Sequence, residues 1–337
     1  MVQRKRDIWV DNVKVLSCIL VGLGHFFQSM VKSGVLPNNG LYQWFNQTIY
    51  YFHVPLFFVC SGYLYQKYST VDSVETWGRN ICKKAIVLGI PYITFSTVTW
   101  LLKTVFSGSV NDQIGGLAET LILSPTSPYW FLYSLFFVFG VTPTLRNRNH
   151  IIAVIGIAVL AKSLSMSGKD TGIYAINTVL AYEIWFVLGM GIAFSSLDKK
   201  IQKRKGLVAG GLLFVIFLLL SVGVYFRRID SVGIEFFLAL IACVSVVVCF
   251  ISVFKSGKQL SSWGFLAEYT MPIFLMHTLL AAPLRTVLFK LDVQNAATHV
   301  LAGLLFSFVG PIAVAEIMKR FKWMEFFLYP NKYIRIK

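Results

Sequence analysis

The sequence contains few charged residues. Asp, Glu, Lys and Arg make up 14% of its 337 residues, against about 25% in soluble domains. Hydrophobic residues make up 56%, and the mean hydropathy is +0.67. A disordered chain is excluded by this hydropathy, and a disulfide-rich secreted scaffold by the small number of cysteines, five in the whole chain. The composition predicts an all-α, polytopic membrane protein whose surface lies mostly against lipid.

Acidic residues are scarcer than basic ones. Asp and Glu number 15 and Lys and Arg 31, so the net charge is +16 and the pI about 9.7. In a soluble protein such a surplus would indicate nucleic-acid binding, whereas in a membrane protein basic residues gather on the cytoplasmic side. The positions of the charges decide between the two interpretations.

The sequence contains ten apolar segments of about the length that spans a membrane, roughly 20 residues. If all ten cross the membrane, the even-to-odd connections and the two tails hold 22 of the 31 basic residues, and the opposite side holds five. We therefore expect both termini in the cytoplasm, and the charge needs no nucleic acid to explain it. The segments are 9–31, 43–65, 85–106, 128–145, 150–166, 172–194, 206–226, 234–254, 264–286 and 299–318.

The organisation predicted from this pattern is a single membrane domain over 1–337, with 319–337 as a cytoplasmic interfacial tail. The sequence shows no cleavable signal peptide, soluble domain or long internal repeat. None of the five cysteines falls on the outer side, so we expect no disulfide. No Cys/His cluster suggests a metal site.

The first span contains ionisable residues, among them Asp11, Lys14 and His25. Lys14 and His25 are eleven residues apart, so on a helix they lie on one face, about 16 Å apart along the axis. One interpretation is structural, with a snorkelling lysine and a histidine that only packs. The other is functional, with a cation at the cytoplasmic mouth and a titratable base deep in the membrane.

The second span contains His53, Pro55 and the pair Ser61-Gly62. Pro55 predicts a kink, because its ring removes a backbone hydrogen bond. Ser61-Gly62 would let another backbone or a ligand approach closely. His53 is either a second polar group near His25 or an interfacial histidine.

Basic residues follow in the connection 66–84. Arg79 and Lys83 are at positions i and i+4, so a helix would present them together with the adjacent Lys84. Orientation in the membrane is enough to place positive charge here. The specific alternative is a phosphate-rich cytoplasmic ligand held by these three residues and Lys14.

Further polar residues fall inside later spans. Glu183 in the sixth and His277 in the ninth are either catalytic groups or side chains that satisfy a local hydrogen bond. Tyr129 and Trp130 open the fourth span, where they are either part of an interfacial aromatic belt or a surface on which a sugar stacks.

Taken in order, these motifs resemble the acyltransferase-3 family of integral membrane O-acyltransferases, which includes fucose 4-O-acetylase-like and polysaccharide O-acetyltransferases. The motifs are Lys14 and His25, the segment PLFFVCSGY, the basic residues before Pro91-Tyr92, Tyr129-Trp130-Phe131-Leu132 and Phe274-Leu275-Met276-His277. The ten expected spans agree with this family.

The resemblance implies roles for several residues. The essential histidine of the family falls on His25, and its basic residue in the same helix on Lys14, where many members have arginine. Lysine keeps the charge but lacks the planar fork. The residues tied to acetyl-CoA binding fall on Arg79 and Lys83, and the Ser-Gly of the second helix on Ser61 and Gly62.

The function expected from the residues and the resemblance is acetyl transfer. Acetyl-CoA would bind from the cytoplasm, and His25 would act as general base, or as transient acetyl acceptor, toward a hydroxyl of a cell-surface glycan or its lipid-linked precursor. The expected location is the cytoplasmic membrane of a bacterium, with membrane lipid and the glycan acceptor as partners. The alternative is a transporter or flippase for a glycan precursor, in which His25 and Glu183 relay protons.

Overall fold

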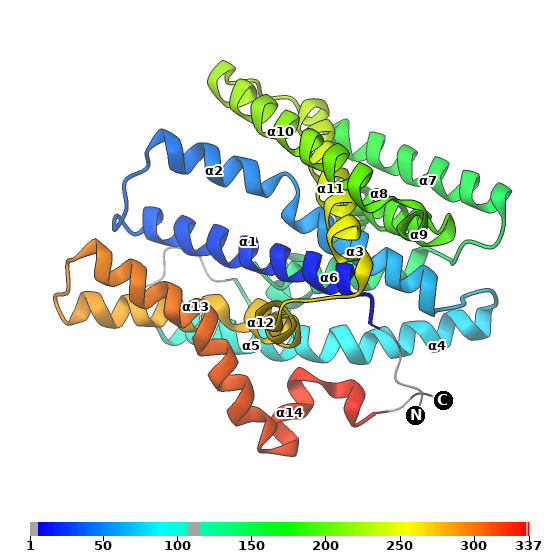
Figure 1. The fold of residues 1–337 in the computed structure, drawn as a ribbon. Helices are drawn as coiled ribbons and strands as arrows, with labels where there is room; N and C mark the ends of the chain where they lie inside the picture. The colour runs from blue at the N-terminus through cyan, green and yellow to red at the C-terminus, as the bar shows by residue number, and fades with distance from the viewer. Residues whose placement is uncertain (1–5, 107–114, 335, 337) are drawn as a thin grey trace.

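The structure is a computed structural model that describes residues 6–106, 115–334 and 336. Throughout these residues the regular structure is helical, with no strand. Eight helical segments are long and apolar enough to cross a membrane, and they coincide with eight of the ten predicted spans. The chain is therefore a polytopic helical membrane protein, and its helices form one bundle in which α1 lies between α2 and α13 in the view of Figure 1.

The second predicted span is two helices rather than one. Helix α2 covers Gly40–Tyr50 and α3 covers His53–Tyr68, with the break at Tyr51-Phe52. Pro55 does not kink a helix, as the sequence predicted, because it lies in the first turn of α3. Backbone N–H groups there have no intrahelical partner, so a proline costs nothing.

The fourth predicted span is shorter than expected. Helix α6 covers only Trp130–Val141, twelve residues or about 18 Å, well below the roughly 30 Å thickness of the hydrocarbon core. Its residues pack into the protein core, with Phe131, Leu135 and Val138 all buried. Helix α6 is therefore apolar because it is buried among other helices.

The basic connection before the third span forms part of a long helical segment. Helix α4 (Val74–Lys84) continues through a π-helical turn, Ala85–Gly89, into α5 (Ile90–Val105). A proline ring normally clashes with the carbonyl four residues earlier, and the wider π turn immediately before Pro91 relieves that clash.

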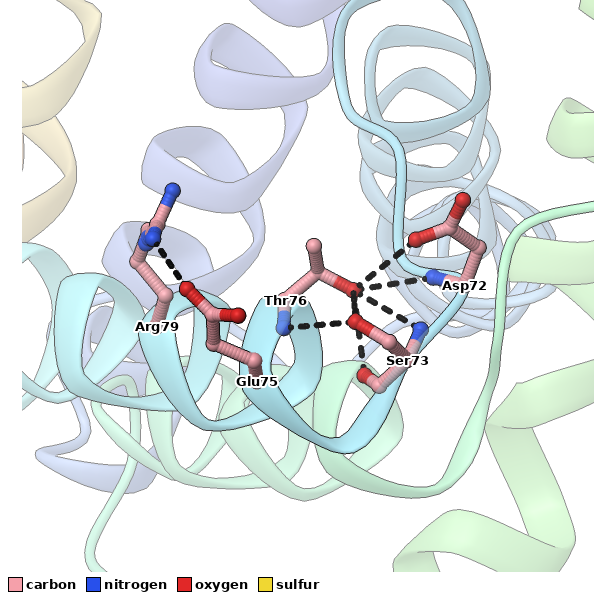
Figure 2. A network of polar contacts seen from close by, with 5 residues as sticks. All are labelled: Asp72, Ser73, Glu75, Thr76 and Arg79. Atoms are coloured by element: carbon pink, nitrogen blue, oxygen red, sulfur yellow. Dashed lines mark hydrogen bonds and ion pairs between the residues drawn. The ribbon is translucent and has the colours of Figure 1, made fainter.

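The start of α4 is fixed by a capping box. Ser73 accepts a hydrogen bond from the Thr76 backbone N–H at 3.2 Å, and the Thr76 hydroxyl accepts one from the Ser73 N–H at 2.9 Å (Figure 2). Two otherwise unpaired donors are thereby satisfied. One turn further on, Arg79 reaches back to Glu75.

The centre of the bundle is the contact between α3 and α8 (Tyr174–Phe194). A methyl group added at Gly62 would lie 1.9 Å from the carbonyl oxygen of Phe186, and one at Gly189 would lie 1.9 Å from that of Val59. The two backbones touch at these glycines. This confirms the close approach predicted for Ser61-Gly62, and the approaching backbone is that of α8.

The remaining helices surround this pair. Helix α1 (Ile8–Lys32) packs against α3 and α12. Helices α7, α10 and α13 lie at the outside of the bundle (Figure 1) and bury only a small share of their residues, as lipid-facing helices do. Their bounds are α7 Arg148–Met166, α9 Leu197–Lys200, α10 Lys203–Arg227, α11 Val232–Val253, α12 Ser261–Lys290, α13 Ala296–Lys319 and α14 Lys322–Leu328.

Candidate functional site

Two histidines from distant parts of the chain face each other inside the bundle. His25 on α1 and His277 on α12 have ring centroids 5.4 Å apart, with the planes tilted by 35°. His277 is buried, whereas His25 is partly exposed. Helix packing brings together residues that are 252 positions apart, which sequence spacing alone does not predict.

The hydrogen bonds of His277 define its chemistry. Its Nδ1 lies 3.0 Å from the carbonyl oxygen of Ile273 and 2.9 Å from that of Phe274. A nitrogen between two carbonyl oxygens must carry the proton, so Nε2 is the acceptor of a neutral ring. Nε2 is buried and has no hydrogen-bond partner among the described residues. Such an orphaned acceptor is uncommon in a protein interior and is a candidate for binding a ligand.

Ser127 is the partner of His25 that the sequence interpretation missed. Its hydroxyl lies 3.3 Å from His25 Nε2 and is on the exposed segment before α6. A lone serine beside a proline gives no signal in a sequence, since its importance depends on the fold of a distant helix. The contact places Nε2 of His25 beside an exposed side chain.

His53 is connected to the pair through Tyr50. The Tyr50 ring packs edge-on against His53 at 4.6 Å and against His25 at 6.4 Å. His53 is buried, and its Nδ1 lies 2.5 Å from the carbonyl oxygen of Ile49. Of the two interpretations left open for His53, the structure favours the polar neighbour of His25.

Glu183 lies in a different interface. It is buried between α6 and α8, where its carboxylate accepts a hydrogen bond of 3.1 Å from Thr142. In the described ranges, no hydrogen bond or ring contact joins it to any of the three histidines. This contact joins the end of α6 to α8, and a catalytic role of Glu183 stays a prediction.

Tyr129 and Trp130 also have structural contacts. The Tyr129 side chain is completely buried, with its hydroxyl 2.9 Å from that of Thr99 and donating to the Leu275 carbonyl at 2.9 Å. A stacking surface for a sugar needs an open ring face, which Tyr129 lacks. Trp130 packs against Tyr182 at 5.2 Å.

The predicted cofactor-binding lysines gather at the other end of the same helix. Lys14 is half-buried on α1, which runs without interruption to His25. Its charge acts on that of Lys84, whose ammonium lies 3.7 Å from the Phe139 ring centroid, and Lys83 beside it is exposed. In the described part of the chain no carboxylate lies within 4.0 Å of the Lys14 ammonium, although the charge of Asp11, one turn earlier and paired with Arg6, acts on it. Ammonium groups that act on one another and form no close ion pair fit a polyphosphate ligand.

Arg79 and Ser61 have partners already. Arg79 forms an ion pair of 2.7 Å with Glu75, and its side chain is 51% exposed (Figure 2). Ser61 donates a 2.7 Å hydrogen bond to the Phe57 carbonyl within α3. Both stay predicted ligands of acetyl-CoA. Arg79 can bind a phosphate of acetyl-CoA only if it gives up its ion pair with Glu75.

The fold and these side chains define a class of protein: a multi-pass helical membrane protein with a histidine pair inside the bundle and a basic cluster at one end. The sequence profile of the acyltransferase domain family, acyltransferase-3, matches residues 7–316, so the chain belongs to this family.

Three curated bacterial proteins are similar to parts of the chain. Nodulation protein NolL of Mesorhizobium japonicum is 29% identical over 169 residues, which cover 48% of this chain and 43% of NolL. NolL of Sinorhizobium fredii is 31% identical over 43% of this chain and 38% of its own length. The inner membrane protein YcfT of Escherichia coli is 24% identical, over 73% of this chain and 70% of YcfT. The chain thus matches less than half of either NolL, and no solved structure matches it.

Proposed function

We propose that this protein is an O-acetyltransferase of a bacterial cytoplasmic membrane, which transfers an acetyl group from acetyl-CoA to a hydroxyl of a cell-surface glycan or its lipid-linked precursor. The observation that carries the proposal is the His25–His277 pair, because an accessible imidazole beside an unsatisfied buried one is suited to proton transfer in a chain of an acyltransferase family.

The chemistry balances with these groups. The acceptor hydroxyl loses its proton to His25 Nε2 as its oxygen forms a bond to the thioester carbon. The carbon–sulfur bond then breaks, and the coenzyme A thiolate leaves and takes the proton from His25. His277 Nε2, as an acceptor, orients a hydroxyl or water next to His25.

The length of α1 supports a reaction in which acetyl-CoA binds at the Lys14 end of the helix and its acetyl group reaches His25. Lys14 and His25 are about 16 Å apart along one helix, which is comparable with the reach of an extended pantetheine arm. The nucleotide would lie on Lys14, Lys83 and Lys84, with Arg79 at the rim. No described group of three His, Cys, Asp or Glu side chains could hold a metal ion, and the proposal needs none.

The test is acetyl transfer by the purified protein. Incubation with radiolabelled acetyl-CoA and the surface polysaccharide of the native cells is expected to label the polysaccharide. His25→Ala is expected to lower the rate at least about 100-fold, the usual effect of removing a general base, without lowering acetyl-CoA affinity. The proposal is wrong if the wild type neither binds acetyl-CoA saturably nor labels the polysaccharide.

The transporter alternative relied on a His25–Glu183 relay, and the contacts of Glu183 do not favour it.

A further inference from the structure

A polar cleft opens between α2, the end of α10 and the start of α11. Its volume is about 570 Å³, within the range of small-ligand sites. The polar groups that line it are Gln43, Gln47, Tyr225, Arg228, Asp230 and Glu235. None of these is used in the proposed transfer.

The composition of the lining selects the ligand. The lining contains one arginine and two carboxylates, so the cleft has no excess of positive charge to hold a phosphate or an anionic lipid headgroup. Side-chain amides and carboxylates instead provide paired donors and acceptors, which suit neighbouring hydroxyl groups, and the aromatic rings of Tyr225 and Phe226 provide apolar surface. This combination fits an uncharged carbohydrate.

Helix α2 connects the cleft to the histidines. Gln43, Asn46, Gln47 and Tyr50 have the spacing i, i+3, i+4, i+7 and so form one polar face of the helix. Gln43 at one end accepts a 3.2 Å hydrogen bond from Tyr225. Asn46 accepts one of 3.2 Å from Gln28 on α1, and Tyr50 at the other end packs against His25 and His53.

The opposite face of α2 is apolar and fixed in place. Trp44, Phe45 and Ile49 line an apolar pocket against α10 and α11, and the Trp44 indole donates a 3.2 Å hydrogen bond to Ser221. Because this face anchors the helix, the polar face keeps a constant position relative to both the cleft and His25.

We propose that the cleft and the polar face of α2 form an acceptor subsite for an oligosaccharide, in which the cleft holds a sugar residue distant from the one that is acetylated. Tyr50 follows Gln43 by seven positions, a rise of about 10 Å along the helix, which is more than the length of one sugar ring. The acceptor is therefore recognised as a chain of at least two sugars. This inference rests on the proposed function for the identity of the reacting sugar.

The test measures binding separately from transfer. Oligosaccharides released by mild acid from the surface polysaccharide of the native cells are separated by size and titrated onto the purified full-length protein by calorimetry. We expect saturable binding of di- and larger saccharides, weakened at least ten-fold in the double variant Gln43→Ala/Gln47→Ala. Acetyl-CoA affinity should stay unchanged in this variant.

Two further variants keep the test decisive. Gln294→Ala removes an exposed amide between α12 and α13, outside the cleft, and should bind like the wild type. Glu235→Gln keeps the shape of the cleft but removes a charged acceptor, and should weaken binding even if the double variant does not fold. Equal binding by wild type and both cleft variants, no binding of any fraction, or displacement by millimolar inorganic phosphate would overturn the inference. Binding without acetyl transfer would instead contradict the proposed function alone.

Discussion

His277 satisfies one ring nitrogen with backbone carbonyls and leaves the other buried without a partner. A purely structural histidine would be replaceable, since removing an unsatisfied buried acceptor relieves a desolvation cost. Under the proposed function, Nε2 of His277 accepts a hydrogen bond and orients a hydroxyl or water beside His25. The two roles predict opposite results for a substitution that fills the space with an apolar ring.

The variant His277→Phe separates these roles. We expect the melting temperature to stay unchanged or rise, while the acetyl-transfer rate falls at least ten-fold, because the acceptor atom is lost and the volume is kept. Thermal unfolding and the transfer assay measure the two quantities on one preparation. Full activity in His277→Phe would show that the nitrogen has no part in the reaction.

Arg79 gives a second prediction at the scale of a residue. It is paired with Glu75 on an exposed helical surface, where such pairs contribute little to stability. Releasing the guanidinium should therefore strengthen phosphate binding without changing the melting temperature. We expect Glu75→Gln to raise acetyl-CoA affinity about two- to five-fold, and Arg79→Gln to lower it. Equilibrium binding of acetyl-CoA is the measurement, and an effect of the same sign in both variants would contradict a phosphate role for Arg79.

Among the elements, the crossing of α3 and α8 depends on two glycines. A methyl group at Gly62 or Gly189 would overlap a backbone carbonyl, which cannot move as a flexible side chain can. Gly62→Ala and Gly189→Ala should each cost at least about 3 kcal/mol, at the upper end of overpacking effects. The expected result is loss of the folded peak in fluorescence size-exclusion chromatography.

Gly191→Ala is the matched control for this contact. It lies on the same helix, and a methyl group there would have no atom within 4 Å. It should fold and gain slightly from the better helix propensity of alanine. If Gly189→Ala behaves like Gly191→Ala, the two backbones are not in contact at this position.

The sequence predicted helices better than it predicted their breaks. Apolar runs identify segments that avoid water, but they do not distinguish a lipid-facing helix from one buried in protein, which is why α6 was expected to be longer. Pro55 indicates an irregularity in the helix, but a proline is compatible both with a kink inside a helix and with the first turn of a new one, where it lies here. For the site, Lys14 and His25 follow from the helical repeat, whereas Ser127 and the pairing with His277 depend on long-range packing.

At the scale of the whole molecule, the orientation in the membrane is a prediction from the charge distribution. Of the five cysteines, all described, only Cys82 is exposed, and it lies on α4 at the expected cytoplasmic end. A membrane-impermeant maleimide should therefore label inside-out vesicles and not right-side-out ones. Mass spectrometry of the labelled peptide measures the result.

Two variants support this orientation test. Cys82→Ser should abolish the labelling of inside-out vesicles and leave both preparations unlabelled. Asn38→Cys in that background places a thiol at an exposed position before α2, at the opposite end, and should produce labelling in right-side-out vesicles only. The reverse pattern would place both termini outside and would remove the cytoplasmic access that acetyl-CoA needs.

The uninterrupted course of α1 has a consequence for how a group crosses the bilayer. Lys14 and His25 belong to one rigid rod, so the distance between them is constant, at about half of the roughly 30 Å hydrocarbon thickness. Under the proposed function, the acetyl group covers that distance through the length of the coenzyme arm. Transfer across the permeability barrier then needs no alternation between inward-open and outward-open states, and coenzyme A never leaves its own compartment.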